Sequence, residues 1–505
     1  MLNPLLFCPA GRNIAGRGNA IMTIHTDIQW LADRRTKIIA TLGPASANAM
    51  TICRLLMAGV NLFRVNMSHG NHHEHGDMIR LIRRLSAEVE KPVAILADLC
   101  GPKIRVGTFA GGSITLNNDE KVIITTRDVI GKSGLIPSQY PKLAADIAVG
   151  QHILLADGLM ELKVEAIEGT EVHCVVLQGG QLSDHKGMNL PDTHVTAASL
   201  TDKDRLDAEF ALGCGVDFLA LSFVRTAFDV KALRALINKA GTSTGLVAKI
   251  ERAEALQHIE DILAAADAIM VARGDLGVEL PPEKVPMIQQ ALITRAREAN
   301  KPVIIATQML ESMIDQIRPT RAEVSDVSHA VTSGADAIML SAETAAGLHP
   351  VEAVEMMDRV ARYTESSLWY GGTFGSFDME KTSRQGMPVT DALAVSTAQL
   401  SRDLQVKCII VISESGTSAT AVSSARPAAP VIAITAIPAT FRQMCLLWGV
   451  QPVLIKPEEL SNKVSLARFW ARTYGLVQPG DRILLVRWFH QDPIKNTPSI
   501  TILNV

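Results

Sequence analysis

Eight short apolar runs, separated by helix-forming stretches or by longer insertions, occupy residues 36–344 of this chain. They are "TKIIATLG" from residue 36, "LFRVNMSH" from 62, "VAILADLCG" from 93, "FLALSFV" from 218, "GLVAKIE" from 245, "AIMVARGDLG" from 268, "PVIIATQML" from 302 and "AIMLSAET" from 337. Strands that alternate with helices form a parallel sheet covered on both faces, and eight such units can close into a barrel. We therefore expect an α/β fold built on a (β/α)8 TIM barrel.

Two segments depart from this alternation. Residues 103–198 contain short β-rich runs punctuated by glycines, which predicts an inserted all-β domain. After the linker-like "GGTFGSFDMEKTSRQGMP", four further apolar runs alternate with helical stretches and predict a C-terminal open α/β domain. The expected division is an N-terminal extension at 1–35, a barrel at 36–102 and 199–370, an inserted β domain at 103–198, and a C-terminal α/β domain at 371–505.

The composition narrows the classes of partner. With 49 basic and 52 acidic residues the chain carries no basic surplus for nucleic acid or an anionic membrane. Its seven cysteines show no C-x-x-C spacing, which favours reduced thiols in a cytoplasmic protein over a zinc or disulfide framework. No apolar run is long enough to span a membrane, and the N-terminus lacks signal-peptide features; Met22 is an alternative start. We expect small molecules and other subunits as partners.

Polar residues stand at the carboxyl ends of the predicted strands, where barrel enzymes place their chemistry. Lys249 and Glu251 are two residues apart and share one face of a strand, and Asp275 follows the next strand. Two carboxylates could hold Mg²⁺, with Mn²⁺ as an alternative, while Lys249 meets charge that develops in a transition state. A structural ion pair at the barrel rim remains the alternative.

The run "FRVNMSH" places Arg64, Asn66 and Ser68 on one strand face. A guanidinium can bind a phosphate with two hydrogen bonds, and the two neutral side-chain oxygens together with Asp98 could ligate a hard cation. An arginine on a strand is, however, more often an ion-pair partner. The interpretation as a phosphate and cation site is favoured because the ends of three predicted strands carry residues suited to the same chemistry.

The tripeptide Arg-Gly-Asp in "VARGDLG" can mark an exposed adhesion loop, but here it follows an apolar core segment directly. Gly274 and Gly277 would let a loop backbone approach a ligand, and its N–H groups could accept a carboxylate. A plain turn is the alternative.

Three weaker patterns have ordinary explanations. In "NHHEHGD", a solvated helix that starts at Asn71 is favoured over a metal site, because neighbouring helix positions face apart. In "ISESGTSATA", residues 412–421, a phosphate cradle and an ordinary capped turn explain the pattern equally well. Asp157 stands in a short turn of the inserted domain and could be structural.

Nine motifs together resemble the pyruvate kinase family, in that family's order from residue 37 to 347. They are "KIIATLGPAS", "FRVNMSHG", "DLCGPKIRVG", "HKGMNLP", "AKIERAEA", "VARGDLGVEL", "ATQMLESMI", "PTRAEVSDV" and "LSAETAAG". The resemblance implies transfer of a phosphoryl group from phosphoenolpyruvate to ADP, giving pyruvate and ATP in the final step of glycolysis. It also implies Mg²⁺, a homotetramer, and an inserted domain that acts as a lid.

The resemblance assigns roles to individual positions. Glu251 and Asp275 match the Mg²⁺ ligands, Lys249 the lysine that stabilises the phosphoryl in flight, and Arg64 the phosphate-holding arginine. Gly274 and its neighbours would receive the substrate carboxylate, and Thr307 would lie beside the enolate that is protonated. The positions that match the nucleotide site are Asn66, His69, Arg105 and Lys186.

The chain departs from the family pattern at two places. Many members hold K⁺ at positions that match Asn66, Ser68, Asp98 and the backbone of Leu99, beside a glutamate where this chain has Lys103. The lysine ammonium could supply the missing charge, so we expect K⁺ to be dispensable. The second departure is Ala156, where related lids often carry an aspartate before the one that matches Asp157.

The positions Ser413, Ser415, Thr417 and Ser418 match the family's effector loop, which lacks a basic residue here. We expect activation by a phosphorylated metabolite such as a sugar monophosphate or AMP.

Two other functions remain compatible with the pattern. A catalytically silent metabolite sensor could share the fold, but it would be expected to have lost Arg64, Lys249, Glu251 or Asp275. A Mg²⁺-dependent aldolase acting on a pyruvate enolate could share the carboxylates and the arginine, but it would need neither the lid nor Lys249.

Overall fold

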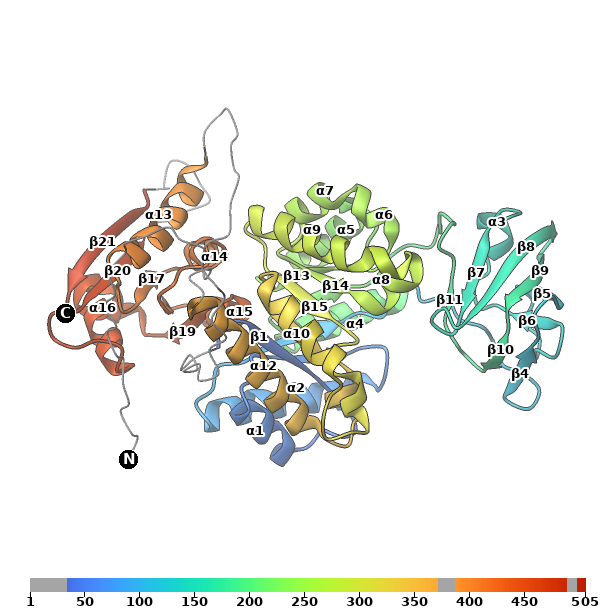
Figure 1. Ribbon diagram of the computed structural model, residues 1–505, viewed down its shortest axis with the longest axis horizontal. Coiled ribbons are helices and arrows are strands. Elements are labelled where there is room, and N and C mark those ends of the chain that lie inside the picture. The colour runs from blue at the N-terminus through green and yellow to red at the C-terminus, as the bar shows by residue number, and fades with distance from the viewer. Residues whose placement is uncertain (1–33, 371–386, 488–496) are drawn as a thin grey trace, which may run out of the picture.

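The computed structural model describes residues 34–370, 387–487 and 497–505; residues 1–33 with Cys8 and Met22, and most of the expected linker, lie outside them. Eight parallel strands close into a barrel (Figure 1) in the order β1-β16-β15-β14-β13-β12-β3-β2, which confirms the expected TIM barrel. Their bounds are β1 (Lys37–Leu42), β2 (Leu62–Asn66), β3 (Ala94–Asp98), β12 (Phe218–Leu221), β13 (Gly245–Ile250), β14 (Ala268–Ala272), β15 (Val303–Ala306) and β16 (Ala337–Leu340).

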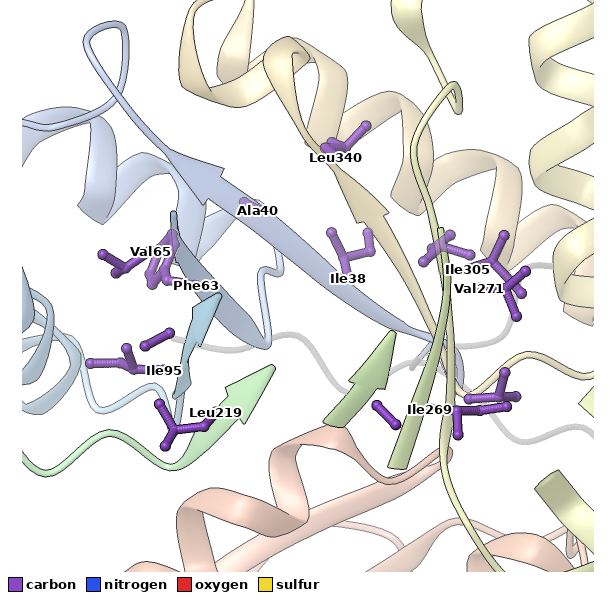
Figure 2. Packing of buried hydrophobic residues seen from close by; sticks show 14 of the residues in the cluster. Ile38, Ala40, Phe63, Val65, Ile95, Leu219, Ile269, Val271, Ile305 and Leu340 are labelled. Atoms are coloured by element: carbon purple, nitrogen blue, oxygen red, sulfur yellow. The ribbon is translucent and has the colours of Figure 1, made fainter. Parts of the chain in front are cut away.

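Both faces of the barrel wall are buried. On β1, Ile39 belongs to the inner core, whereas Ile38 and Ala40 belong to the outer cluster that packs against the helices. Figure 2 shows this outer cluster, including Phe63 and Val65 of β2. Strands buried on both faces read as continuous apolar runs, which is why the eight strands were visible in the sequence.

Four of the surrounding helices begin at polar capping residues. Asn71, Thr201, Thr226 and Thr320 each form a capping box with an acidic residue three positions later. Asn71 caps α2, so the predicted helix start in "NHHEHGD" is confirmed. The helices of the barrel layer are α1 (Ala49–Met57), α2 (His72–Glu88), α4 (Asp202–Gly213), α5 (Ala227–Lys239), α6 (Ala253–Gln257), α7 (Ile259–Ala265), α8 (Arg273–Glu279), η1 (Pro282–Lys284), α9 (Val285–Glu298), η2 (Glu311–Ile314), α10 (Arg321–Thr332), α11 (Ala342–Ala345) and α12 (Pro350–Tyr370).

The inserted β domain, hereafter the lid, has its own core around Ile124, Leu162 and Val172. It contains a two-stranded and a six-stranded sheet, together with one short helix that the sequence did not predict. Its elements are β4 (Ser113–Leu116), β5 (Lys121–Thr125), β6 (Leu135–Pro137), α3 (Leu143–Asp146), β7 (His152–Leu155), β8 (Met160–Glu168), β9 (Glu171–Gln178), β10 (Gly180–Ser183) and β11 (Met188–Asn189).

The C-terminal α/β domain is an open five-stranded sheet in the order β19-β18-β17-β20-β21, and only the last strand is antiparallel to its neighbour. In Figure 1 this domain and the lid lie at opposite ends of the barrel. Its elements are α13 (Val389–Asp403), β17 (Ile409–Ile412), α14 (Thr417–Ser424), β18 (Val431–Thr435), α15 (Pro438–Gln443), η3 (Met444–Leu446), β19 (Val450–Leu454), η4 (Pro457–Ser461), α16 (Lys463–Thr473), β20 (Arg482–Arg487) and β21 (Ser499–Asn504).

The C-terminal domain closes the amino-terminal end of the barrel. Cys445 and Leu446 of η3 belong to the same buried cluster as the inner barrel residue Ile39. Lys37, at the start of β1, donates a hydrogen bond of 2.7 Å to the carbonyl of Val450. The carboxyl ends of the strands are thereby left as the accessible end. Among the described helices, none is long and apolar enough to cross a membrane.

Candidate active site

Lys249 lies at the centre of a buried charged cluster at the carboxyl ends of β3 and β13. Its Nζ atom is 2.8 Å from Glu251 Oε1 and 3.3 Å from Asp98 Oδ1. Burial alone would lower the pKa of Lys249, but the two carboxylates outweigh burial and raise it. Lys249 is therefore a permanent cation held at the barrel mouth.

Arg64 supports the same cluster from β2. Its Nε atom donates to Asp98 Oδ2 at 2.6 Å, and its second contact is with Thr41 Oγ1 at 3.2 Å. Burial alone would raise the pKa of Asp98, but Lys249 and Arg64 outweigh burial and lower it. Asp98 is therefore ionised and pairs with both cations.

Glu251 and Asp275 form the acidic part of the site. Burial raises the pKa of Glu251; Lys249 opposes this rise, and the negative charge of Asp275 adds to it. The backbone N–H of Phe223 donates to Glu251 Oε2 at 2.7 Å and fixes the carboxylate. Two like charges held close together favour a cation between them.

This pair of oxygen ligands fits Mg²⁺. Among the residues that the structure describes, no group of three or more His, Cys, Asp or Glu side chains is arranged to hold a metal ion. Glu251 and Asp275 would therefore leave most coordination positions to water and substrate oxygens. That division is usual for Mg²⁺, which keeps several waters and takes few protein ligands.

The segment that begins with Arg273 is a helix, and our interpretation of it as a loop was wrong. Helix α8 (Arg273–Glu279) follows β14 directly, so Gly274 lies in its first turn. The first turn of a helix has backbone N–H groups with no partner inside the helix. The N–H of Gly274 can therefore still act as the donor that the sequence predicted. The N–H of Gly274 donates to Thr307 Oγ1 at 2.8 Å.

Thr307 has a strained backbone. Its φ angle is +69°, a conformation that is rare for a β-branched residue. Arg273 donates to its carbonyl through Nη2 at 2.8 Å and through Nε at 3.3 Å. Strain of this kind persists where the surroundings enforce it, and it concentrates at active sites.

The expected monovalent-cation positions lie near each other on adjacent strands. Asn66 and Asp98 are cross-strand partners, and the carbonyl of Leu99 accepts a hydrogen bond of 2.8 Å from Ser222 Oγ. The Oδ1 atom of Asn66 accepts the N–H of Ser68 at 3.2 Å. The ammonium of Lys103 instead lies 3.5 Å from Asp275 Oδ1.

The four expected nucleotide residues are divided between two domains. Asn66 and the exposed His69 are on the barrel, whereas Arg105 and the exposed Lys186 are on the lid. Arg105 donates to the carbonyl of His185 at 2.9 Å. No hydrogen bond or ion pair in the described parts of the chain joins the two lid residues to the two barrel residues. Figure 1 shows the lid standing away from the barrel.

The expected effector loop connects β17 to α14. Ser413 and Ser418 are buried, whereas Ser415 Oγ and Thr417 Oγ1 lie near the surface and 2.9 Å apart. Gly416 has a φ angle of +88°, which permits the tight turn. Of the four expected residues, only Ser415 and Thr417 are placed to meet a ligand without rearrangement.

Sequence reasoning did not assign a role to Ser222 or Arg273. Ser222 Oγ accepts a hydrogen bond from Lys249 Nζ at 2.7 Å, and Arg273 holds Thr307. Ser222 ends the run "FLALS", so its position at a strand's carboxyl end was an available signal.

Comparison with known proteins gives a consistent result. The family model for the pyruvate kinase barrel domain matches residues 33–354, and the model for the pyruvate kinase alpha/beta domain matches residues 391–500. The chain is 41% identical over 479 residues to the pyruvate kinase of Geobacillus stearothermophilus, covering 94% of this chain and 80% of the relative. It is 42% identical over 459 residues to the pyruvate kinase of Staphylococcus aureus strain MRSA252, covering 90% and 77%.

A solved structure is similar over nearly the whole chain. The crystal structure of a pyruvate kinase from Cryptosporidium parvum superposes with a TM-score of 0.86 at 35% sequence identity. The match covers 93% of this chain and 96% of that one.

Proposed function

The chain belongs to the pyruvate kinase family, and we propose that it transfers the phosphoryl group of phosphoenolpyruvate to ADP at the barrel mouth, with Mg²⁺ bound. Because it belongs to this family, the chain is a phosphotransferase. The products would be pyruvate and ATP, in the final step of glycolysis. The observation that carries the proposal is the cluster of Lys249, Glu251 and Asp98 at the barrel mouth, with Asp275 beside Glu251.

Phosphoryl transfer requires mainly positioning and charge neutralisation. Lys249 would face the phosphoryl group in flight, because its charge is permanent and its Nζ atom is held by Asp98 and Glu251. Arg64 would bind the phosphate before transfer. Glu251 and Asp275 would hold Mg²⁺, which neutralises negative charge on substrate oxygens when bound.

The other end of the substrate would meet α8 and Thr307. Gly274 would donate its backbone N–H to the substrate carboxylate, a role that requires its bond to Thr307 Oγ1 to be exchanged for the substrate. The Thr307 hydroxyl would then lie beside the enolate carbon that receives a proton. Arg273 would keep Thr307 in place through the carbonyl contact.

The nucleotide would bind between barrel and lid. Asn66 and His69 would contact it from the barrel, and Arg105 and Lys186 from the lid. Closure of the lid would bring these groups together and exclude water, so that transfer to ADP competes successfully with hydrolysis. A pocket between the two domains is lined by Lys103 and Asp275, among others, and by none of the four residues assigned to the nucleotide.

Three further properties belong to the proposal. The ammonium of Lys103 would make K⁺ dispensable beside Asn66, Ser68, Asp98 and Leu99. A phosphorylated sugar or AMP would activate the enzyme at the loop 413–418. The enzyme would be a cytoplasmic homotetramer.

A coupled assay tests the function directly. Pyruvate formation is followed with phosphoenolpyruvate, ADP and Mg²⁺, and each is omitted in turn. We expect turnover only with all three, and Lys249→Met should lower kcat by at least about 100-fold. Lys121→Met, which removes an exposed lid lysine paired with Glu165, is the control.

Two outcomes would favour the other candidates. Binding of phosphoenolpyruvate without turnover under any condition would favour a metabolite sensor. Consumption of pyruvate with an aldehyde, independent of ADP, would favour an aldolase.

A further inference from the structure

Asp217 connects the barrel to the C-terminal domain at the start of β12. Its carboxylate is buried and accepts a hydrogen bond of 2.6 Å from Arg442 Nε of α15. Its second oxygen accepts bonds from Arg83 Nη2 at 2.6 Å and from the N–H of Ile95 at 2.8 Å. The start of β12 is therefore held in place by residues of both domains.

The opposite end of β12 holds the active site. Ser222 follows the strand, accepts a hydrogen bond from Lys249 Nζ at 2.7 Å and donates one to the carbonyl of Leu99 at 2.8 Å. Phe223, the next residue, donates its backbone N–H to Glu251. Both residues proposed to act on the phosphoryl group and its metal are thus held by the segment that Asp217 anchors.

Between these ends lies a short and rigid element. Strand β12 has four residues, all buried, and it pairs with β3 on one side and β13 on the other. A strand of this length spans roughly 13 Å, and close packing prevents it from absorbing a shift at one end. A displacement of Asp217 would therefore be carried to Ser222 and Phe223.

We propose that Arg442 is a positioning residue for Lys249 and Glu251, acting through Asp217 and the strand β12. This inference rests on the proposed function, because it assigns the two residues to phosphoryl transfer and metal binding. It gives the C-terminal domain a direct route to the active site. Helix α15 also reaches the loop 413–418, since Thr440 Oγ1 donates to the carbonyl of Glu414 at 2.8 Å.

The substitution Arg442→Gln tests the proposal. Asp217 keeps its bonds to Arg83 and Ile95, and the Arg442 side chain is 29% exposed, so the variant should fold. We expect kcat to fall about tenfold, since small displacements of reacting groups are costly. Mn²⁺ binding in the absence of substrate, measured by electron paramagnetic resonance, should weaken about threefold as Phe223 releases Glu251.

The Michaelis constant for ADP provides the contrast. The expected nucleotide residues are not held by β12, so KM for ADP should stay within about twofold of the wild-type value. Arg468→Gln removes another C-terminal arginine, which donates to the carbonyl of Asn504, and should change none of these quantities. If Arg442→Gln does not fold, Arg442→Lys takes its place; it keeps a cation opposite Asp217 without the Nε donor geometry, so kcat and Mn²⁺ affinity should both fall, by smaller factors.

A double-mutant cycle identifies the route. Ser222→Ala alone should also lower kcat, and combining it with Arg442→Gln should give a loss close to that of the more severe single variant. If the kcat loss of the double variant equals the product of the two single losses, the proposal is overturned. It is also overturned if kcat and Mn²⁺ affinity are unchanged in Arg442→Gln. These results differ from failure of the proposed function, in which the wild-type chain itself would form no pyruvate.

Discussion

The ammonium of Lys103 lies 3.5 Å from Oδ1 of Asp275, so the first residue of the inserted domain is paired with a proposed metal ligand. Both side chains are partly exposed, at 29% and 25%. A pair of this kind contributes at most about 1 kcal/mol, because water screens it. A divalent cation that binds Asp275 can therefore displace Lys103 at little cost in free energy. The positive charge of Lys103 then remains available nearby.

Asp275→Asn should keep the fold and lower turnover. The substitution removes one of two carboxylates proposed to bind Mg²⁺, so kcat should fall at least about 100-fold and half-saturation should require about tenfold more Mg²⁺. Turnover as a function of Mg²⁺ concentration measures both quantities. Asp119→Asn, at an exposed lid position with a φ angle of +64°, is the control. Near-normal turnover would refute the role of Asp275.

Lys103→Glu should create a requirement for K⁺. The wild-type enzyme should turn over equally fast in K⁺ and in tetramethylammonium at equal ionic strength, because the lysine supplies the positive charge. The variant should lose at least about tenfold in tetramethylammonium and recover in K⁺. Strong activation of the wild type by K⁺ contradicts this idea, as does a variant that is indifferent to the cation.

Replacement of Ser415 and Thr417 by alanine should abolish activation by phosphorylated metabolites. These two hydroxyls lie near the surface, whereas Ser413 and Ser418 are buried, so the double variant should leave the domain intact. Rates are measured across a panel of sugar monophosphates and AMP at a low concentration of phosphoenolpyruvate. Ser396→Ala, on an exposed position of α13, is the control. Activation curves that coincide with the wild type place the effector elsewhere.

Lys37 should make stability depend on alkaline pH. Burial lowers the pKa of Lys37 from 10.5 to about 8 in the folded chain. Between these values the unfolded chain binds more protons, so the free energy of unfolding that this group contributes rises with pH. The rise between pH 7 and pH 10 should be about 2.5 kcal/mol, and the full burial penalty applies only well below pH 8.

The measurement compares the wild type with Lys37→Met in urea at pH 7 and at pH 10. The variant should lack this part of the pH dependence, and the exposed Lys121→Met should retain it. An equal change in all three proteins would show that Lys37 is not the group responsible.

The barrel strands could be predicted because each is buried on both faces and reads as an unbroken apolar run. Strand β21 was not predicted. Its residues Ser499–Asn504 form an edge strand with little burial, and nothing in their spacing indicates an antiparallel partner. Helix α8 was misread because Gly274 and Gly277 are poor helix formers, although both are tolerated in so short a helix.

The site was predicted where its residues share a strand, and missed where they meet only in the folded chain. Lys249 and Glu251 are two positions apart, so period-two geometry was sufficient to join them. Arg442 and Asp217 are 225 positions apart, and no local pattern relates them. The separation of lid and barrel residues likewise follows from domain placement, which spacing along the chain does not encode.

Insertion of η3 into the barrel floor has a consequence for protein synthesis. The barrel strands leave the ribosome long before Cys445 and Leu446, which complete the buried cluster around Ile39. Until then the growing chain exposes an apolar opening at the base of a barrel that is otherwise formed. Nascent chains of this protein should therefore need protection by chaperones until translation of the last domain is nearly complete.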